Sequence, residues 1–371
     1  MFRLLNFILS IVDPSIPKNK RIIVFSGNGL RGLNGNVLAV VNGWHSVERT
    51  KAFKSYVLSW KGENFPGFIT ISPNTLKGLW ILLRSYTVII THGPADLFWL
   101  SLCDPKRRRI INLWHGGGAL KMTGTWNWKD SALIVTSESA RKIIAKSTGE
   151  NIKRVFVTGY PRTDAIVNDT PVLKKRALDI LREKDRGQKW VLYAPTHRKG
   201  VGGKEEGYLH RLPDFSIGDL INILEKNNTN LIFRPHVNDQ IIDFPKNRRI
   251  FYVPFEKLNE IEPLYALADI LVTDYSSAAF DFVLLDRPIL GLAGDFKDYS
   301  KYQGFLVDYR SSFPGPIAQS WKQLKNLLEA ALCKPTDHAD VRRRIRNKFN
   351  KFVDGKSTDR VIDLVCDLSI K

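Results

Sequence analysis

Short apolar runs alternate with helix-length segments along almost the whole chain, and this alternation constrains the fold more than any other feature. Most of the runs are rich in β-branched residues and stop at Gly, Pro, Ser or Asn, as buried parallel strands do. The predicted strands are 21–25, 55–58, 87–91, 109–113, 133–136 and 154–158 in the first half and 189–194, 231–234, 249–253, 270–273 and 288–292 in the second. The intervening segments are long enough for crossover helices. The pattern therefore predicts an α/β fold with two open, doubly wound parallel sheets.

The chain has 371 residues, which is too long for one ordinary hydrophobic core, so two domains are expected. The sequence becomes polar and helix-prone after a turn at 159–162. We expect an N-terminal domain at 1–163 and a C-terminal domain at 164–371, with a last helix that can cross back to the first. Ligands of such sheets bind at the carboxyl ends of the strands. The polar or aromatic residues that follow predicted strands closely are His92, His115, Tyr160, Thr196, His236 and Asp274.

The net charge of +19 is unevenly distributed along the chain. Residues 1–165 carry 23 Lys and Arg against 9 Asp and Glu, whereas 166–371 carry 33 against 28. A basic first half indicates an acidic partner there: nucleic acid, anionic lipid headgroups or a phosphorylated substrate. The densest basic run, 106–109, is either part of such a surface or a solvated loop. Three widely separated cysteines argue against a disulfide framework or a zinc site.

The segment 2–12 is apolar apart from an Arg, an Asn and a Ser, but it is shorter than a membrane-spanning helix. No small-residue cleavage site follows it, so no signal peptide is expected. Two interpretations remain: a helix lying in a membrane interface, or a helix packed on its own domain. A second apolar stretch at 76–83 is expected to be a buried helix, with membrane contact as the alternative.

The stretch LVTDYSSAAFDF (271–282) places an apolar strand before Asp274 and two hydroxyls, Ser276 and Ser277, at an expected helix start. Unpaired backbone N–H groups and a partial positive charge at a helix start make an anion site, most often for phosphate. Ser is also a good helix cap without any ligand, so both interpretations stay open from this motif alone.

A glycine-rich turn, WHGGG (114–118), follows the strand predicted at 109–113. Three glycines let the backbone approach a ligand closely, and they leave the His115 imidazole at a strand end. Lys121 follows shortly. The spacing fits neither a dinucleotide-binding fingerprint nor a P-loop. A turn without a ligand is the structural alternative.

Cationic and hydroxyl side chains recur at strand ends in the second half. Arg234 and His236 lie together, and a guanidinium matches phosphate oxygens while an imidazole donates or moves a proton. Thr196 and Arg198 lie at a similar level, whereas the neighbouring His197 is the weakest candidate. The DGKSTDR segment (354–360) offers one more helix start with cations. These features predict an anionic nucleotide ligand, a diphosphate ester. The acidic residues of 274–286 lie on one helical segment, so no metal site is expected.

Several motifs together resemble the CDP-glycerol glycerophosphotransferase family, whose members build teichoic-acid-like polymers. They are WHGGGALKMTG (114–124), TGYPRTD (158–164), LYAPTHR (192–198), RPH (234–236), LADILVTDYSSAAFDF (267–282) and DGKSTDR (354–360). The matches run in family order from about residue 110 to 365, and the first hundred residues match loosely, chiefly through Gly35-Asn36. The extra glycines before Lys121 resemble the primase-type members more than the polymerases.

The resemblance implies a GT-B-like fold, with two Rossmann-like domains facing across a cleft. It implies transfer of glycerol phosphate, or a related polyol phosphate, from CDP-glycerol to a hydroxyl of a lipid-linked saccharide, with release of CMP. The implied catalytic residues are His115, as general base, and His236, and these two roles could be exchanged. The implied donor- and phosphate-binding residues are Arg162, Thr196, Arg198, Arg234, Asp274, Ser276, Ser277, Asp354, Gly355 and Arg360. The implied acceptor-side residues are Gly35, Asn36, Gly116, Gly117 and Lys121.

No cofactor is expected beyond the CDP-activated donor substrate. The acceptor and the basic first domain imply an anionic membrane surface as a partner, and peripheral attachment at the cytoplasmic face of the cell membrane. A GT-B glycosyltransferase using a nucleotide-sugar is the alternative enzyme. Nucleic-acid binding is the alternative function that is not enzymatic. However, no aromatic residues interleave with the basic run at 106–109 and no nucleic-acid motif is present. No nucleic-acid partner is therefore expected.

Overall fold

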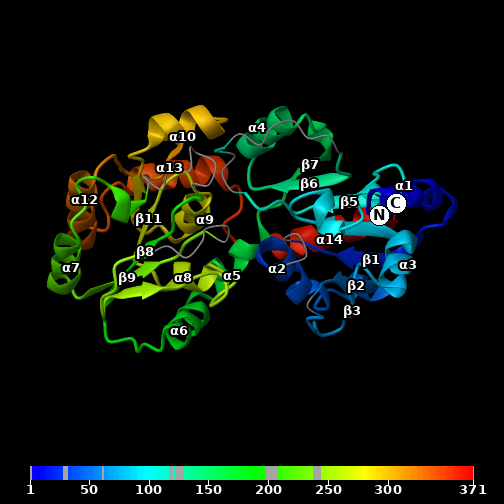
Figure 1. Ribbon diagram of the computed structural model, residues 1–371, viewed down its shortest axis with the longest axis horizontal. Coiled ribbons are helices and arrows are strands. Elements are labelled where there is room, and N and C mark those ends of the chain that lie inside the picture. Colours follow the sequence, from blue (N-terminus) through cyan, green and yellow to red (C-terminus); the bar gives the residue numbers. More distant parts are fainter. Residues whose placement is uncertain are drawn as a thin grey trace. The chain divides into compact units, whose positions relative to one another are not determined.

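The computed structural model describes residues 2–27, 32–60, 62–116, 120–121, 129–197, 208–236 and 244–370. The chain forms two compact units, drawn in Figure 1. Unit 1 comprises Met1–Gly116, Thr123–Asp164 and Asp354–Lys371, and unit 2 comprises Gly117–Met122 and Ala165–Val353. The main crossing between the units therefore falls at Asp164, and the C-terminal residues return to unit 1.

Unit 1 is built on a seven-stranded parallel sheet of order β3-β2-β1-β4-β5-β6-β7. Its strands are β1 (Asn19–Phe25), β2 (Lys54–Leu58), β3 (Ile69–Ile71), β4 (Ser85–Ile90), β5 (Arg109–Asn112), β6 (Ala132–Val135) and β7 (Val155–Val157). Its helices are α1 (Phe2–Val12), α2 (Gly35–Trp44), α3 (Leu76–Arg84), α4 (Glu138–Thr148) and α14 (Ser357–Ile370). Its 3₁₀ turns are η1 (Asp13–Ser15), η3 (Glu48–Ala52), η4 (Pro94–Leu97), η5 (Leu100–Leu102), η6 (Ile152–Arg154) and η7 (Pro161–Thr163). The direction of winding changes between β1 and β4, which is where ligands of such sheets bind.

Unit 2 is built on a six-stranded parallel sheet of order β10-β9-β8-β11-β12-β13. Its strands are β8 (Lys189–Tyr193), β9 (Thr229–Phe233), β10 (Ile250–Tyr252), β11 (Ile270–Thr273), β12 (Ile289–Leu292) and β13 (Ile317–Ala318). Its helices are α5 (Asp164–Asn168), which begins at the crossing, α6 (Thr170–Leu181), α7 (Ile217–Lys226), α8 (Glu262–Leu267), α9 (Ala278–Phe282), α10 (Phe296–Gln303), α11 (Tyr309–Ser312), α12 (Trp321–Cys333) and α13 (Ala339–Phe349), with 3₁₀ turns η8 (Leu209–Arg211) and η9 (Val283–Leu285). Winding reverses here between β8 and β11.

The prediction of two doubly wound parallel sheets is confirmed, and every predicted strand has a counterpart. The sequence pattern missed β3 and β13, which have three and two residues. Runs this short at the edge of a sheet carry too little periodicity to be recognised. Local signals do fix several helix boundaries. Ser137 and Ser320, for example, accept the backbone N–H groups of Ala140 and Gln323 at the starts of α4 and α12.

Each sheet has its own hydrophobic core. In unit 1 the inward residues of β1, β2 and β4 pack with α3 and with Leu97, Trp99 and Leu102, which follow β4. In unit 2 the residues of β8, β9 and β11 pack with α7 and α12, and the indole of Trp321 is fully buried there. Central parallel strands buried on both faces explain why these segments read as continuous apolar runs.

Helix α1 packs on unit 1 through one face and exposes apolar side chains on the rest of its surface. Leu9 is 7% exposed, and the Asn6 side chain accepts the backbone N–H of Ser101 at 3.3 Å. Phe7 and Ile11 are 62% and 60% exposed. The two interpretations of 2–12 are therefore compatible, because the helix packs on its domain and still presents an apolar face. Within the part of the chain that the structure describes, no helix combines the length and apolarity needed to cross a membrane.

A buried ion cluster fastens the end of α1 to the rest of unit 1. The carboxylate of Asp13 accepts hydrogen bonds from the guanidinium of Arg108 and from Lys18 Nζ, the latter at 2.6 Å. Arg108 also donates to the carbonyl of Leu82 at 2.7 Å, and Lys18 donates to that of Leu83 at 2.7 Å, both in α3. Arg108, one cation of the basic run at 106–109, is thus buried and structural. The two interpretations of that run from sequence are an anion-binding surface and a solvated loop, and neither includes a buried cation.

Candidate functional site

The loop after β5 presents His115 at the carboxyl edge of the unit 1 sheet. Asn112 Oδ1 accepts the backbone N–H of Trp114 at 2.9 Å, and Trp114 adopts a left-handed backbone with φ of 51°. The exposed His115 ring approaches the carbonyl oxygen of Thr91 through Nδ1 at 3.2 Å. Because a carbonyl only accepts, Nδ1 carries the hydrogen in this contact. The lone pair of a neutral His115 ring is therefore on Nε2.

A second imidazole lies directly against the first. The rings of His92 and His115 stack with centroids 4.0 Å apart and planes 12° apart. Nδ1 of His92 lies 2.7 Å from Thr91 Oγ1, which in turn donates to the buried carboxylate of Asp96 at 3.2 Å. His92 follows β4 and His115 follows β5. Sequence reasoning noted both as strand-end residues but did not place His92 in the site, because the pairing depends on β4 and β5 being neighbours.

Asn36 and Arg162 hold the backbone of the His115 loop. The buried amide of Asn36 donates from Nδ2 to the carbonyls of Leu113 at 2.7 Å and Trp114 at 3.0 Å. Its Oδ1 accepts the backbone N–H of Arg162 at 3.2 Å. Arg162 Nη1 donates to the carbonyl of His115 at 3.0 Å. Two residues assigned from sequence to opposite substrates, Asn36 to the acceptor and Arg162 to the donor, thus both contact one loop.

The remaining acceptor-side candidates are only partly described. Gly35 begins α2 with φ of 52°, a left-handed conformation that favours glycine. A Cβ at Gly116 would lie 3.0 Å from the indole nitrogen of Trp114, so this position has little room for a side chain. Gly117 lies outside the described residues. Lys121 pairs with Phe305 in an isolated antiparallel bridge, and both residues belong to unit 2.

The DGKSTDR segment forms the start of α14 within unit 1. The carboxylate of Asp164 accepts the backbone N–H groups of Ser357 at 2.9 Å and Thr358 at 2.6 Å. Arg360 forms an ion pair with Asp354, which lowers the pKa of that carboxyl through a side-chain hydrogen bond. The anion at this helix start is therefore a carboxylate of the chain itself.

In unit 2, Thr196 and Asp274 meet where the winding of the sheet reverses. Both carboxylate oxygens of Asp274 accept the backbone N–H of Thr196, at 2.9 and 3.0 Å. Ser276 Oγ accepts the backbone N–H of Ala278 at 3.2 Å, and Ser277 is the residue before α9. Helix α9 has only five residues, little more than one turn. The helix dipole that was expected to attract an anion at this helix start is therefore small.

Arg234 and His236 follow β9 and differ sharply in exposure. Arg234 is 7% exposed and donates to the carbonyl of Val253 at 3.1 Å. Burial lowers its pKa to about 10, so the guanidinium stays charged at neutral pH. His236 is exposed, and its ring stacks on that of His197 with centroids 5.4 Å apart. The weakest sequence candidate, His197, thus contacts a strong one. Arg198 lies outside the described residues.

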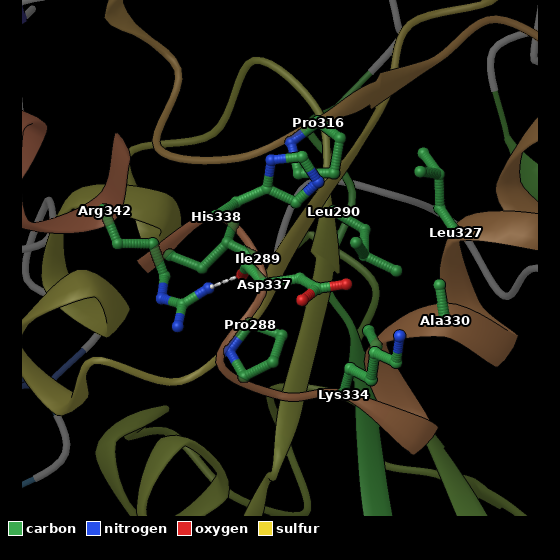
Figure 2. Close-up of a pocket in the computed structure, with 11 residues that line it drawn as sticks. Pro288, Ile289, Leu290, Pro316, Leu327, Ala330, Lys334, Asp337, His338 and Arg342 are labelled. Atoms are coloured by element: carbon green, nitrogen blue, oxygen red, sulfur yellow. Dashed lines mark hydrogen bonds between the residues drawn. The ribbon is translucent and has the colours of Figure 1, made fainter. Parts of the chain in front are cut away.

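Figure 2 shows a pocket at the opposite end of the unit 2 sheet. It is lined by the start of β12, Pro288 to Leu290, and by residues of the α12–α13 connection, including Lys334, Asp337 and His338. Arg342 donates to the carbonyl of Asp337 at 2.6 Å. No predicted site residue lines this pocket. Among the described side chains, no group of three or more His, Cys, Asp and Glu is placed to hold a metal ion.

Comparison with known proteins gives a family and a fold. The model of the CDP-Glycerol:Poly(glycerophosphate) glycerophosphotransferase family matches residues 8–367. The chain is 29% identical to a teichoic acid poly(ribitol-phosphate) polymerase of Bacillus spizizenii over 70% of its own length and 43% of the relative's. It is 27% identical to a teichoic acid glycerol-phosphate primase of Bacillus subtilis over 79% of its own length and 76% of the relative's. The chain spans about half the length of the ribitol-phosphate polymerases that it matches.

Among solved structures, that of the wall teichoic acid polymerase TagF superimposes with a TM-score of 0.79 at 19% identity, covering 98% of this chain and 93% of that one. A likeness at this identity is one of fold. The prediction of a GT-B-like architecture is therefore confirmed.

Proposed function

We propose a function that follows from the family of this chain. The chain belongs to the CDP-glycerol:poly(glycerophosphate) glycerophosphotransferase family, as its motifs predicted. The chain transfers glycerol phosphate, or a related polyol phosphate, from a CDP-activated donor to a hydroxyl of a lipid-linked saccharide. The family description supports the donor and the transferred group. The glycine-rich loop after His115 supports a primase-type reaction, in which one unit is added to the acceptor.

In the proposed reaction an acceptor hydroxyl oxygen attacks the β-phosphorus of CDP-glycerol. A new phosphorus–oxygen bond forms to the acceptor, the bond to the bridging oxygen breaks, and CMP leaves with that oxygen and its electron pair. The hydroxyl proton passes to His115 Nε2. Charge that develops on the transferring phosphoryl group is stabilised by cationic and hydrogen-bonding groups of unit 2.

The observation that carries this assignment is the contact of His115 Nδ1 with the carbonyl oxygen of Thr91 at 3.2 Å. It fixes the tautomer, so that the basic nitrogen of the ring is Nε2. Asn36 and Arg162 support the same role, because three hydrogen bonds of 2.7–3.0 Å hold the backbone carbonyls of residues 113–115. A base held at a fixed position fits proton transfer better than one on an unsupported loop.

On the donor side we assign Arg234, His236, Ser276 and Ser277 to the diphosphate. Arg234 stays charged although it is buried, and so keeps a positive charge at the carboxyl edge of the sheet, whereas the ring of His236 is exposed to solvent. Asp274 acts indirectly. Its carboxylate holds the backbone of Thr196, and a carboxylate in contact with a phosphate would be repelled by it.

We place the protein at the cytoplasmic face of the membrane, attached peripherally through unit 1. The exposed apolar face of α1 supports this, together with Leu76 and Trp80 of α3, which are 88% and 54% exposed. The cluster of Asp13, Lys18 and Arg108 links the end of α1 to α3. The exposed apolar residues of the two helices therefore belong to one connected part of unit 1. The excess of Lys and Arg in residues 1–165 would add attraction to anionic lipid.

The catalytic assignment is tested with the variants His115→Ala and His236→Ala. We expect His115→Ala to abolish CMP release in the presence of acceptor while CDP-glycerol binding stays nearly unchanged. His236→Ala is expected to weaken both turnover and donor binding. Wild-type turnover of His115→Ala would refute the base assignment, and loss of turnover without loss of donor binding in His236→Ala alone would exchange the two roles.

A further inference from the structure

The paired imidazoles of His92 and His115 come from the ends of adjacent strands. Ile90 of β4 lies opposite Asn112 of β5 in the sheet, so the two strands end side by side. The two rings then lie almost parallel, 12° apart, with centroids separated by 4.0 Å. This is face-to-face contact over the ring surface, not an edge contact or a hydrogen bond between them.

The segment that carries His92 is anchored by a buried carboxylate. Asp96, which is fully buried, accepts the backbone N–H groups of Thr91 at 2.7 Å and of His92 at 2.8 Å. It also accepts the hydroxyl of Thr91 at 3.2 Å. Since the hydroxyl hydrogen points to Asp96, the Thr91 oxygen accepts from His92 Nδ1 at 2.7 Å. A chain of directed hydrogen bonds therefore links the His92 ring, through Thr91, to the buried carboxylate of Asp96.

The hydrogen bond at the His115 ring is longer than the one at the His92 ring. Its ring is exposed, and the Nδ1 contact with Thr91 is 3.2 Å long. The Nδ1 contact acts at one ring atom, whereas the stacked ring of His92 covers a whole face of the imidazole and so restricts its rotation. Asn36 and Arg162 fix the loop backbone, not the ring.

We propose that His92 is a positioning residue, whose stacked ring holds the imidazole of His115 in the plane needed for proton transfer. The proposal rests on the role of His115 proposed above. Asp96 holds the backbone of residue 92 through its N–H group, a bond that substitutions of the side chain keep, and the ring at this position covers one face of His115. Because the contact is made by a ring face, a flat side chain that cannot exchange protons should serve in place of His92 without loss of turnover.

Two substitutions separate the ring contact from the hydrogen bond. His92→Phe keeps a flat ring against His115 but cannot donate to Thr91. His92→Asn keeps an amide that can donate to Thr91 but has no ring to stack. We expect turnover to fall about 10- to 100-fold in His92→Asn, with unchanged affinity for CDP-glycerol, and to stay within about threefold of wild type in His92→Phe. His45→Asn, at an exposed histidine of the same unit whose ring contacts Phe68, is the matched control.

A second measurement does not depend on activity. The chain has seven histidines, so the ring signals can be resolved by NMR after histidine labelling and assigned by single substitution. A stacked neighbour shifts the ring protons of His115 upfield. We expect that shift to persist in His92→Phe and to disappear in His92→Asn, while the melting temperature of each variant shows that it is folded.

If turnover falls equally in His92→Asn and His92→Phe while both stay folded, a ring face alone does not hold His115 and the proposal is wrong. Wild-type turnover of His92→Asn, or a His115 signal that does not move in it, would overturn the proposal. An active His92→Asn with an inactive His92→Phe would also overturn it, since the hydrogen bond and not the ring would then matter. If His115→Ala retains turnover, the base assignment fails instead, and the NMR result still reports whether the rings pair.

Discussion

The carboxylate of Asp164 accepts the backbone N–H of Ser357 at 2.9 Å, across 193 residues of sequence. The same carboxylate accepts the N–H of Thr358 at 2.6 Å. Two sequence motifs, TGYPRTD and DGKSTDR, thus meet at the start of α14. A helix start offers several unpaired N–H groups, and here the chain supplies the anion that binds them. This contact ties the returning C-terminal helix to the point where the chain crosses between units.

Removal of this cap should destabilise unit 1. We expect Asp164→Ala to lower the free energy of unfolding by about 1–2 kcal/mol, the usual cost of losing a side-chain cap, and more if the buried N–H groups stay unsatisfied. Asp359→Ala removes an exposed carboxylate from the same first turn and should cost only a few tenths of a kcal/mol. Urea denaturation measures both. Equal effects of the two substitutions would show that Asp164 acts only through its charge.

The amide of Asn36 should be essential for the geometry of the His115 loop. Asn36→Asp replaces the donor that binds the carbonyls of Leu113 and Trp114 with an acceptor. We expect turnover to fall and the unfolding free energy to drop by about 1–3 kcal/mol, because buried carbonyls lose their partners. Asn42→Asp makes the same chemical change at an exposed position of α2 and is the control. An Asn36→Asp variant with wild-type turnover would contradict this role.

The three cysteines should differ in reactivity. Burial raises the pKa of Cys103 to about 12 and that of Cys366 to about 11, whereas Cys333 is exposed. Since the thiolate is the reactive form, we expect an alkylating reagent at pH 8 to label Cys333 in the folded protein and the other two only after unfolding. Mass spectrometry counts the labels. Rapid labelling of Cys103 or Cys366 without denaturant would show that their surroundings open readily.

The exposed and buried faces of α1 should have separable effects. Phe7→Ser with Ile11→Ser removes exposed apolar surface, so we expect weaker binding to anionic vesicles without a change in melting temperature. Leu9→Ala truncates a buried side chain and should lower the free energy of unfolding by about 2–5 kcal/mol while the exposed apolar surface of α1 stays intact.

Vesicle binding of the intact protein should also weaken as salt rises, because the attraction of its cations to anionic lipid is screened. Failure of the intact protein to sediment with anionic vesicles at low salt would refute membrane attachment.

Much of the architecture could be predicted because it depends on local pattern. β-branched runs that end at Gly, Pro, Ser or Asn gave the central strands, and the rule that ligands bind at carboxyl ends directed attention to His115, Thr196, His236 and Asp274. The motifs that carry the family resemblance gave the family, which the match over residues 8–367 confirms.

Relationships between distant segments could not be predicted, because spacing in sequence does not give strand order. The stack of His92 on His115 exists only because β4 and β5 are neighbours, and the stack of His236 on His197 because β8 and β9 are. The burial of Arg108 likewise depends on Asp13, 95 residues earlier. Charge runs and strand-end residues identify candidates, and only the fold shows which of them touch.

The mass of the acceptor after reaction tests the proposed transfer most directly. Purified protein is incubated with CDP-glycerol and a short lipid-linked disaccharide, in parallel with CDP-ribitol and with a nucleotide-hexose donor. We expect an acceptor heavier by one glycerol phosphate, or by one ribitol phosphate with the second donor, and one CMP released for each unit added. An acceptor that gains no mass from either CDP-polyol but gains a hexose from the third donor would contradict the proposed transfer.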